Sequence, residues 1–383
     1  MNPLFAGQGP SIFAHMSDLA RAHNAVNLGQ GFPDFGWPDD VLDRAAEALR
    51  SGSNQYAPMR GLPELREAVA AHYRRHQRLD VDAEHVVVTS GATEALAAAL
   101  LALISPGDEV VLFQPLYDSY LPIVRSAGGV PRLVRLAPPA WRLTEEALAA
   151  AFGPRTRLVL FNNPHNPSSR LFDEQELALL ADFCVRHDAV AVADEVWEHL
   201  VFDGRRFRPL ASFPGMAERT VKIGSAGKIF SVTGWKVGWA VAPPPLAAVF
   251  ASAHQFLTFS TAPNLQTAVA YGLGKDDAYF DAMRAAFASA RDGFVARLEE
   301  AGFAALAAEG TYFVSIDLAA SGIAADDVGF CERAVRECGV AAIPVSAFYA
   351  EDPVASVVRL CFAKREETLA AGLDGLARAR ELF

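Results

Sequence analysis

Lysine is scarce in this chain, because only five of its 34 basic residues are lysines and the rest are arginines. Three of the five, Lys222, Lys228 and Lys236, nevertheless lie close together in the sequence. Unlike arginine, lysine can lose a proton and attack a carbonyl carbon to form a Schiff base. The lysine count alone fits a compositional bias equally well, so the surrounding residues must decide between bias and chemistry.

The sequence also lacks an excess of basic charge, cysteine motifs and long apolar runs. The net charge of −11 leaves no basic field to attract nucleic acid. The four cysteines form no CxxC pair, which indicates free thiols in a reducing compartment and gives no zinc cluster. The first ten residues have no signal-peptide pattern, and no run reaches the roughly 18 apolar residues of a membrane span. We therefore expect a soluble, cytoplasmic protein that binds neither nucleic acid nor membranes.

The order of apolar runs predicts an α/β fold. From residue 85 onward, short β-branched runs alternate with helix-length segments, and two more strand-like runs follow at 220–224 and 236–242. Such alternation is typical of a mainly parallel sheet with helices on both faces. Between these runs the prolines and glycines mark loops.

The length of 383 residues favours two domains rather than one. We expect a large domain at residues 30–275, which contains the predicted sheet. A smaller α+β domain would combine residues 1–29 with residues 276–383, and would include long helices at 276–301 and 326–338.

Two junctions between a predicted strand and the next helix carry groups that suit a planar, phosphorylated ligand. The carboxyl ends of parallel strands meet at one edge of a sheet, where ligands bind. The segment Ser90–Glu94 opens a helix, and its N–H groups suit a phosphate, although a plain N-cap would look the same. Tyr117 follows the next strand and can stack on a planar ring, or simply be half-buried.

Two further junctions carry an amide and a carboxylate. Asn166 lies in a double Asn-Pro loop, where its amide can bond a phenolate oxygen or only stabilise a turn. Asp194 ends a run of apolar residues, and buried carboxylates are rare unless they are paired. It therefore needs a cation such as a protonated ring nitrogen, unless it caps a helix. Each junction alone is ambiguous, but phosphate seat, aromatic, amide, carboxylate and lysine occur in order along one sheet.

Other motifs are weaker. Gly29-x-Gly31 lacks the third glycine of a dinucleotide-binding fingerprint. The pair Gly227-Lys228 could end a P-loop motif, but Lys222 stands where that motif has its first glycine. His72 and His76 have the i,i+4 spacing of metal ligands, but the arginines around them favour a solvated helix face.

The motifs together resemble the class I aminotransferases of fold type I, which use pyridoxal 5′-phosphate. Ser225-x-x-Lys228, Gly234-Trp-Lys236-x-Gly238, Asn166-Pro167 and Asp194-Glu195 match that family's pattern in order and spacing. The likeness extends from Asn27 to Arg359. It implies a mainly parallel seven-stranded sheet sandwiched by helices, with a smaller α+β domain.

Within the family, the chain is similar to the branch of kynurenine aminotransferases, cysteine-conjugate β-lyases and bacterial methionine aminotransferases. Asn27–Asp34, Thr311–Phe313, Ile343–Ser346 and Arg359–Lys364 carry this narrower likeness. The Pro-His-Asn-Pro sequence at 164–167 resembles the methionine-preferring enzymes.

The resemblance implies a role for each residue around the cofactor ring. Lys228 would hold the cofactor covalently, and Asp194 would keep its pyridinium nitrogen protonated. Tyr117 would stack on the ring, and Asn166 would bond its phenolate oxygen. The family usually has a tyrosine at the position of Trp197, and an indole N–H can donate but cannot ionise or accept. We therefore expect the cofactor linkage to titrate differently from that of tyrosine-bearing relatives.

The phosphate and the substrate would be held by a second set of residues. The phosphate would contact Gly91, Ala92, Thr93, Ser225 and Lys236 of one subunit. Tyr56 would reach it from the neighbouring subunit of a homodimer with shared active sites. Arg359 would clamp the substrate carboxylate with a bidentate fork, beside Gly31 and Asn166. Phe13, Tyr56 and Phe348 are candidates for the pocket walls.

The implied activity is ping-pong transamination between L-amino acids and 2-oxo acids, with methionine, aromatic or glutamine-like donors. An N-succinyldiaminopimelate or aspartate-type aminotransferase and a cysteine-conjugate β-lyase are alternatives. The sequence identifies no second arginine for the distal carboxylate of an aspartate-type substrate. A regulator or an inactive paralogue that binds the cofactor is the alternative from another class. The presence of Lys228, Asp194 and Arg359 together argues against it.

Overall fold

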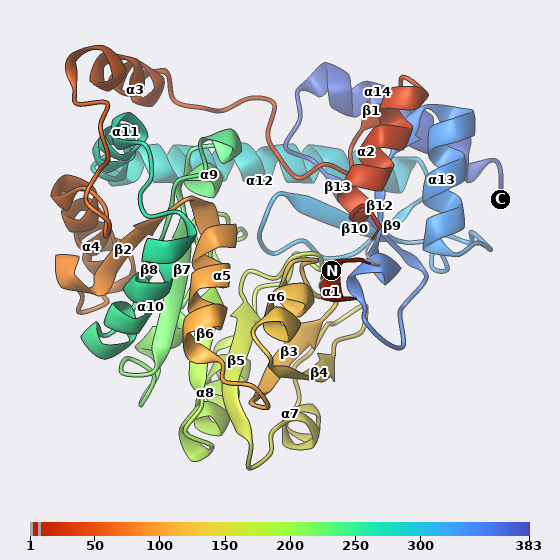
Figure 1. Cartoon of the computed structure of the whole chain (residues 1–383). Coiled ribbons are helices and arrows are strands. Elements are labelled where there is room, and N and C mark those ends of the chain that lie inside the picture. The colour runs from red at the N-terminus through yellow and green to blue at the C-terminus, as the bar shows by residue number, and fades with distance from the viewer. Residues whose placement is uncertain (1–2, 7–8) are drawn as a thin grey trace.

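The computed structural model describes residues 3–6 and 9–383, and its centre is a seven-stranded sheet (Figure 1). The strand order is β2-β8-β7-β6-β5-β3-β4. The strands are β2 (Val86–Thr89), β3 (Glu109–Gln114), β4 (Val130–Arg135), β5 (Thr156–Asn162), β6 (Val190–Asp194), β7 (Thr220–Ser225) and β8 (Gly238–Val241). Only β8 runs antiparallel to its neighbours. The predicted α/β fold with a mainly parallel seven-stranded sheet is confirmed.

Most residues of the inner strands are buried because helices flank the sheet. Every residue of β3 is buried, whereas β4 at the edge alternates between exposed and covered positions. The flanking helices are α5 (Gly91–Leu103), α6 (Tyr120–Ser126), α7 (Glu145–Ala151), α8 (Glu174–Arg186) and α10 (Pro244–Leu257). In Figure 1, α5, α6 and α10 lie side by side in front of the strands. Ala and Leu make up most of α5, which suits a helix with little contact to water.

A second, antiparallel sheet has the order β12-β13-β10-β9. Its strands are β9 (Ala304–Ala305), β10 (Phe313–Asp317), β12 (Ile343–Pro344) and β13 (Val357–Cys361). The helices α2 (Ile12–Ala22), α13 (Asp327–Cys338) and α14 (Glu366–Arg380) lie around it in Figure 1. The first part of the chain joins the last part here, because β1 (Val26–Asn27) pairs with β11 (Val340–Ala341).

The remaining elements connect or cover the two sheets. They are α1 (Pro3–Ala6), α3 (Asp39–Ser51), α4 (Pro63–Gln77), α9 (Ala226–Ile229), α11 (Pro263–Leu273), α12 (Asp277–Glu300) and the short 3₁₀ turns at Ala83–His85, Leu210–Ser212, Thr233–Trp235 and Val345–Phe348. The long helix α12 runs past both sheets in Figure 1. Across residues 3–6 and 9–383, no helix combines the length and hydropathy that a membrane span requires.

Most of the predicted elements exist. Helix α5 begins at Gly91, within the segment Ser90–Glu94 that was expected to open a helix. Helices α10 and α11 are not among the predicted elements, because prolines in the sequence indicate loops. Each of these helices instead has proline in its first turn, where the missing N–H costs no hydrogen bond. Residues 340–344 contain two short strands, β11 and β12, which pair with different partners.

Candidate active site

Most of the predicted site residues line one cavity of about 370 Å³. It opens where β5, β6 and β7 end and where α5 begins. The predicted residues that line it are Gly31, Gly91, Ala92, Thr93, Tyr117, Asn166, Asp194, Trp197, Ser225, Lys228 and Lys236. Arg359 lies next to this set and bonds Asn166. Tyr56 lies elsewhere on the surface of its own chain.

Lys228 lies in α9, the short helix that begins directly after β7. Its Nζ donates to the hydroxyl oxygen of Tyr312 at 3.1 Å and lies 4.6 Å from the centre of the Trp197 ring. Burial lowers the pKa of Lys228 to about 8, although the nearby Asp194 carboxylate raises it in part. A useful fraction of this amine is therefore uncharged near neutral pH, as nucleophilic attack requires.

Asp194 ends β6, and only one of its two carboxylate oxygens has a hydrogen-bond partner. The hydroxyl of Tyr120 donates to Oδ2 at 2.6 Å, whereas Oδ1 is buried without a partner. Burial raises the pKa of Asp194. A cationic N–H group placed against Oδ1 would satisfy this oxygen and would favour the ionised carboxylate. The Tyr120 contact was not predicted from the sequence.

The start of α5 and the end of the β7–β8 hairpin form a narrow cradle. Gly91 has a φ of +78°, and a Cβ atom there would lie 3.3 Å from Nζ of Lys236. A larger residue would be strained at this φ and would crowd the lysine. The first N–H groups of a helix have no acceptor within the helix, so they and the Lys236 ammonium suit an anion. In the described part of the chain, Lys236 forms no salt bridge.

Arg359 in β13 is 1% exposed and is surrounded by aromatic rings. Its guanidinium donates to Oδ1 of Asn166 at 2.8 Å and to the backbone oxygen of Gly29 at 2.9 Å. The rings of Phe313, Phe13 and Phe348 lie 3.9, 5.2 and 5.3 Å from it.

Burial lowers the pKa of Arg359 to about 10, so the group keeps its charge at neutral pH. Its Nε has no partner, and within residues 3–6 and 9–383 no carboxylate neutralises the charge. A carboxylate ligand would supply both the missing acceptor and the missing charge.

Trp197 forms one wall of the cavity and packs against a tyrosine that sequence reasoning did not single out. The two rings of Trp197 and Tyr312 are perpendicular, with centres 4.4 Å apart. The Tyr312 hydroxyl donates to the backbone oxygen of Gly31 at 2.6 Å. In the sequence, Tyr312 is only part of the motif Thr311–Phe313, and no signal there places its hydroxyl next to Lys228.

Tyr56 does not reach the cavity of its own chain, since its side chain is 86% exposed. Its ring packs edge to face against Phe259, with centres 5.8 Å apart. Tyr56 and Phe259 form an exposed aromatic patch. Phe256, three residues before Phe259 in the sequence, is 83% exposed.

The cavity fits pyridoxal phosphate on three observations. The orphaned Oδ1 of Asp194 suits a protonated ring nitrogen, and the cradle of Gly91 and Lys236 suits a phosphate. Lys228 supplies an amine of lowered pKa between them. The donor set therefore agrees with the cofactor that the resemblance implies.

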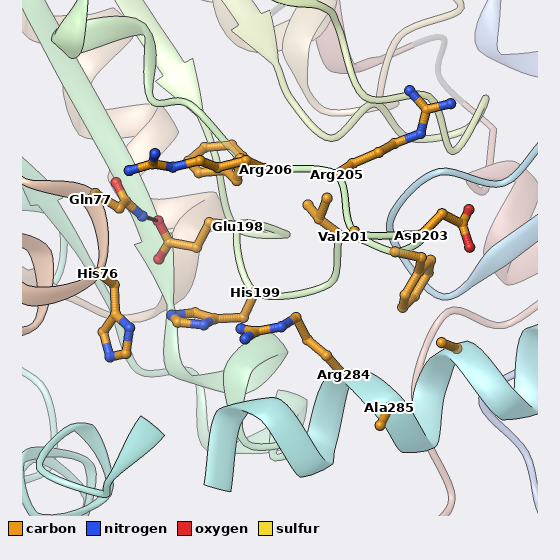
Figure 2. Close-up of a pocket in the computed structure, with 14 residues that line it drawn as sticks. His76, Gln77, Glu198, His199, Val201, Asp203, Arg205, Arg206, Arg284 and Ala285 are labelled. Carbon is orange, nitrogen blue, oxygen red and sulfur yellow. Dashed lines mark hydrogen bonds between the residues drawn. The ribbon is translucent and has the colours of Figure 1, made fainter. Parts of the chain in front are cut away.

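A second hollow of about 480 Å³ lies between α4, the loop after Trp197, and α12 (Figure 2). Its acidic side chains already have partners: Glu198 bonds Lys222 and Gln77, and Asp203 bonds Arg291. His76, His199 and Arg284 gather on one side of it in Figure 2. Within the described residues, no group of His, Cys, Asp and Glu side chains could hold a metal ion.

The expected solvated face is wrong for His72, which is 3% exposed. Its Nε2 lies 2.7 Å from Nε2 of His199, and burial lowers the pKa of His72 to about 3. Arg74 and Arg75 of α4 are exposed as expected, whereas His76 is only partly buried and His72 faces the core.

Comparisons with known proteins agree with this geometry. The family model for aminotransferases of class I and II matches residues 23–376. A probable N-succinyldiaminopimelate aminotransferase of Mycobacterium tuberculosis is 45% identical over 94% of this chain and 93% of its own length. A methionine aminotransferase of Escherichia coli is 42% identical over 96% of this chain and 95% of its own length. A solved structure of N-succinyldiaminopimelate aminotransferase from Mycobacterium tuberculosis has a TM-score of 0.96, with 44% identity, covering 99% of this chain and 100% of that one. The chain belongs to the class I and II aminotransferases and is a pyridoxal-phosphate-dependent enzyme of fold type I.

Proposed function

We propose that this aminotransferase takes the amino group from an unbranched or aromatic L-amino acid, with methionine as the preferred donor, and passes it to a 2-oxo acid. The observation that carries the choice is the aromatic wall around Arg359. Phe13, Phe313 and Phe348 all lie within 5.3 Å of the guanidinium. A side chain that extends from a carboxylate held by Arg359 would meet apolar rings, which suit a thioether or an aromatic ring.

The distribution of positive charge supports an uncharged donor side chain. Lys228 and Lys236 line the cavity, and two further cations, Arg359 and Lys364, bond residues that line it. If Lys228, Lys236 and Arg359 serve the cofactor aldehyde, the phosphate and the α-carboxylate, only Lys364 remains for a distal carboxylate, and its ammonium already donates to the backbone oxygen of Phe32. An aspartate-type or succinylated donor needs such a partner, since an unpaired buried charge is costly. The relative named for N-succinyldiaminopimelate keeps that donor as the second candidate.

Bound pyridoxal phosphate supplies an aldehyde and a ring that accepts electrons. We assign the ring contacts to Asp194, which pairs with the ring nitrogen, and to Tyr117 and Trp197, which flank the ring. Oδ1 of Asn166 accepts from Arg359, and its amide N–H would donate to the ring oxygen, so Asn166 would link the cofactor and substrate positions. Lys228 carries the proton that moves at the substrate Cα, because its pKa of about 8 lets Nζ both accept and release a proton.

The phosphate is assigned to the N–H groups of Gly91, Ala92 and Thr93, to Ser225 and to Lys236. Arg359 orients the substrate through its carboxylate, with Gly31 alongside. We further propose that residues 30–275 form the cofactor-binding domain and that residues 1–29 and 276–383 form the smaller one. In this proposal a second copy of the chain covers the exposed aromatic patch and receives Tyr56 at its phosphate.

A panel of amino donors with one fixed 2-oxo acid tests the donor choice. Methionine and phenylalanine should give kcat/KM values roughly 100-fold above those of aspartate, because a polar mismatch in an apolar pocket costs several kcal/mol. N-succinyl-LL-2,6-diaminopimelate is the decisive comparison. If it gives the largest kcat/KM, the methionine proposal is wrong and the succinylated donor replaces it.

A further inference from the structure

We propose that the Tyr312 hydroxyl holds the amine of Lys228 whenever that amine is free, which makes Tyr312 a further catalytic residue. The inference rests on the role of Lys228 in the proposed function. Tyr312 contacts the reacting nitrogen. It directly precedes β10 in the second sheet, whereas most other site residues lie at the edge of the seven-stranded sheet.

The direction of the hydrogen bonds defines what Tyr312 does. A tyrosine hydroxyl has one proton to donate, and the 2.6 Å contact with the Gly31 backbone oxygen uses it. The lone pairs of the same oxygen are then left for Nζ of Lys228, which lies 3.1 Å away. Tyr312 therefore accepts a hydrogen bond from the amine, whether the amine is charged or neutral.

The amine has no competing partner in its surroundings. Across the described residues, Tyr312 supplies the one hydrogen bond to Nζ of Lys228, and no carboxylate lies within salt-bridge distance of it. The rest of the contact is aromatic, with the ring centres of Trp197 and Tyr312 at 4.6 and 5.4 Å. A free amine on these two ring faces is positioned by the hydroxyl alone.

Packing fixes the position of the Tyr312 ring. The side chain is fully buried, and the rings of Trp197 and Phe313 contact it with centres at 4.4 and 5.0 Å. Its bond to Gly31 also links the amine to the loop whose Gly29 oxygen accepts from Arg359. The amine and the carboxylate-binding arginine are therefore held by the same short loop.

The hydroxyl stabilises the charged amine, because hydrogen bonds to charged groups are stronger than those to neutral groups. Removing it by Tyr312→Phe keeps the ring and should lower the pKa of Lys228. The other titratable groups near this amine are Asp194, Cys361, Arg359 and Lys236, which stay in place. Tyr349→Phe is the matched control, because its hydroxyl also donates to a backbone oxygen, that of Leu136, but has no bond to a lysine.

The experiment uses the apo-enzyme, so it does not depend on which donor is preferred. Limiting acetic anhydride is applied across a pH series, and mass spectrometry measures acetylation of Lys228. We expect the midpoint of labelling to fall by roughly one pH unit in Tyr312→Phe, since hydrogen bonds to charged groups contribute on the order of 1.5 kcal/mol. The Tyr349→Phe midpoint should equal that of the wild type.

An unchanged midpoint in folded Tyr312→Phe overturns the proposal, as does an equal shift in Tyr349→Phe. If Tyr312→Phe does not fold, 3-fluorotyrosine placed at position 312 keeps the shape but weakens the acceptor, and it should shift the midpoint in the same direction by less. With the cofactor loaded, Tyr312→Phe should also lower kcat about tenfold and raise the isotope effect of a Cα-deuterated donor. If the labelling midpoint shifts but the donor panel does not favour methionine, the donor proposal is rejected and the role of Tyr312 stands.

Discussion

Two lysines of the β7–β8 hairpin meet the cavity in different ways at the residue scale. Lys228 has a buried amine of lowered pKa beside aromatic rings, whereas Lys236 is exposed and faces Gly91. The first environment favours a neutral, reactive amine, and the second leaves the Lys236 side chain open to an anionic ligand. Their proposed roles, covalent attachment and phosphate binding, follow from these surroundings.

We expect Lys236→Ala to weaken cofactor binding about ten- to hundredfold, because one charged hydrogen bond to the phosphate is lost. Lys228→Ala should instead abolish covalent attachment while leaving the phosphate contacts intact. Equilibrium dialysis gives the affinity, and borohydride reduction followed by mass spectrometry gives the covalent fraction. Equal affinity of Lys236→Ala and wild type would show that another group carries the phosphate charge.

Trp197 predicts a difference in the pH titration of the bound cofactor. The indole has no hydroxyl to offer the cofactor's ring oxygen, so Trp197→Tyr should move the midpoint of the visible absorbance change. A spectrophotometric titration of both proteins measures it. Identical midpoints would mean that residue 197 does not influence the cofactor linkage, and Trp197→Phe controls for the change in ring size.

Residues that follow directly from strand ends could be predicted from the sequence pattern, whereas Arg359, which arrives from the distant strand β13, followed only from the family resemblance. Asp194 and Lys228 each stand at or just beyond the end of a strand, and the sheet order brings them together. Tyr120 contacts Asp194 from 74 residues away along the chain, and Tyr312 contacts Lys228 from 84 residues away. A tyrosine that bonds a site residue has the same local sequence pattern as a tyrosine that only packs in the core.

At the element scale, a buried ionic cluster joins β7 to the segment that follows β6. Nζ of Lys222 in β7 bonds carboxylate oxygens of Glu195 and Glu198, each at 2.6 Å. Tyr73 from α4 donates to the same Glu198 at 3.0 Å. Lys222, the third of the clustered lysines, thus has a structural role, because it neutralises two buried carboxylates.

Lys222→Met should destabilise the fold by about 3–5 kcal/mol at neutral pH, because two buried carboxylates lose their cation. Burial raises the pKa of Glu195, so lowering the pH protonates it and should recover part of this loss. Urea unfolding at two pH values measures both effects. Lys275→Met, which breaks the ion pair with Asp40 near the surface, is the control and should cost about 1 kcal/mol or less.

The helices that were not predicted illustrate why local signals fail at this scale. The prolines before α10 end a strand and begin a helix at once, and only the packing of α10 on α5 decides for the helix. His254 of α10 shows that packing directly, because its ring bonds Glu94 of α5 and the backbone oxygen of Met59.

At the scale of the whole molecule, the aromatic patch remains uncovered by its own chain. Tyr56 and Phe256 are more than four-fifths exposed, which is unusual for rings that stay in water. We expect the protein to sediment as a dimer. Mixed subunits give the sharper measurement, because Tyr56 is proposed to act in the partner's site.

Lys228→Ala and Tyr56→Ala should each impair activity when expressed alone. In a hybrid dimer of the two, one site would combine an intact Lys228 with an intact Tyr56 of the partner and would regain activity. Co-expression with two different affinity tags isolates the hybrid for assay. No regain in a hybrid that is dimeric and folded would place Tyr56 outside the partner's site.

The antiparallel pairing of β7 and β8 has a consequence for the cofactor as a structural part. Ser225 lies opposite Gly238 in the register, so residues 226–237 form a loop whose two ends are neighbours. A cofactor attached at Lys228 and bonded by its phosphate to Lys236 would connect the first and last turns of this loop. It would then act as a removable crosslink, and amide hydrogen exchange within the loop would depend on cofactor occupancy more than on the stability of the sheet.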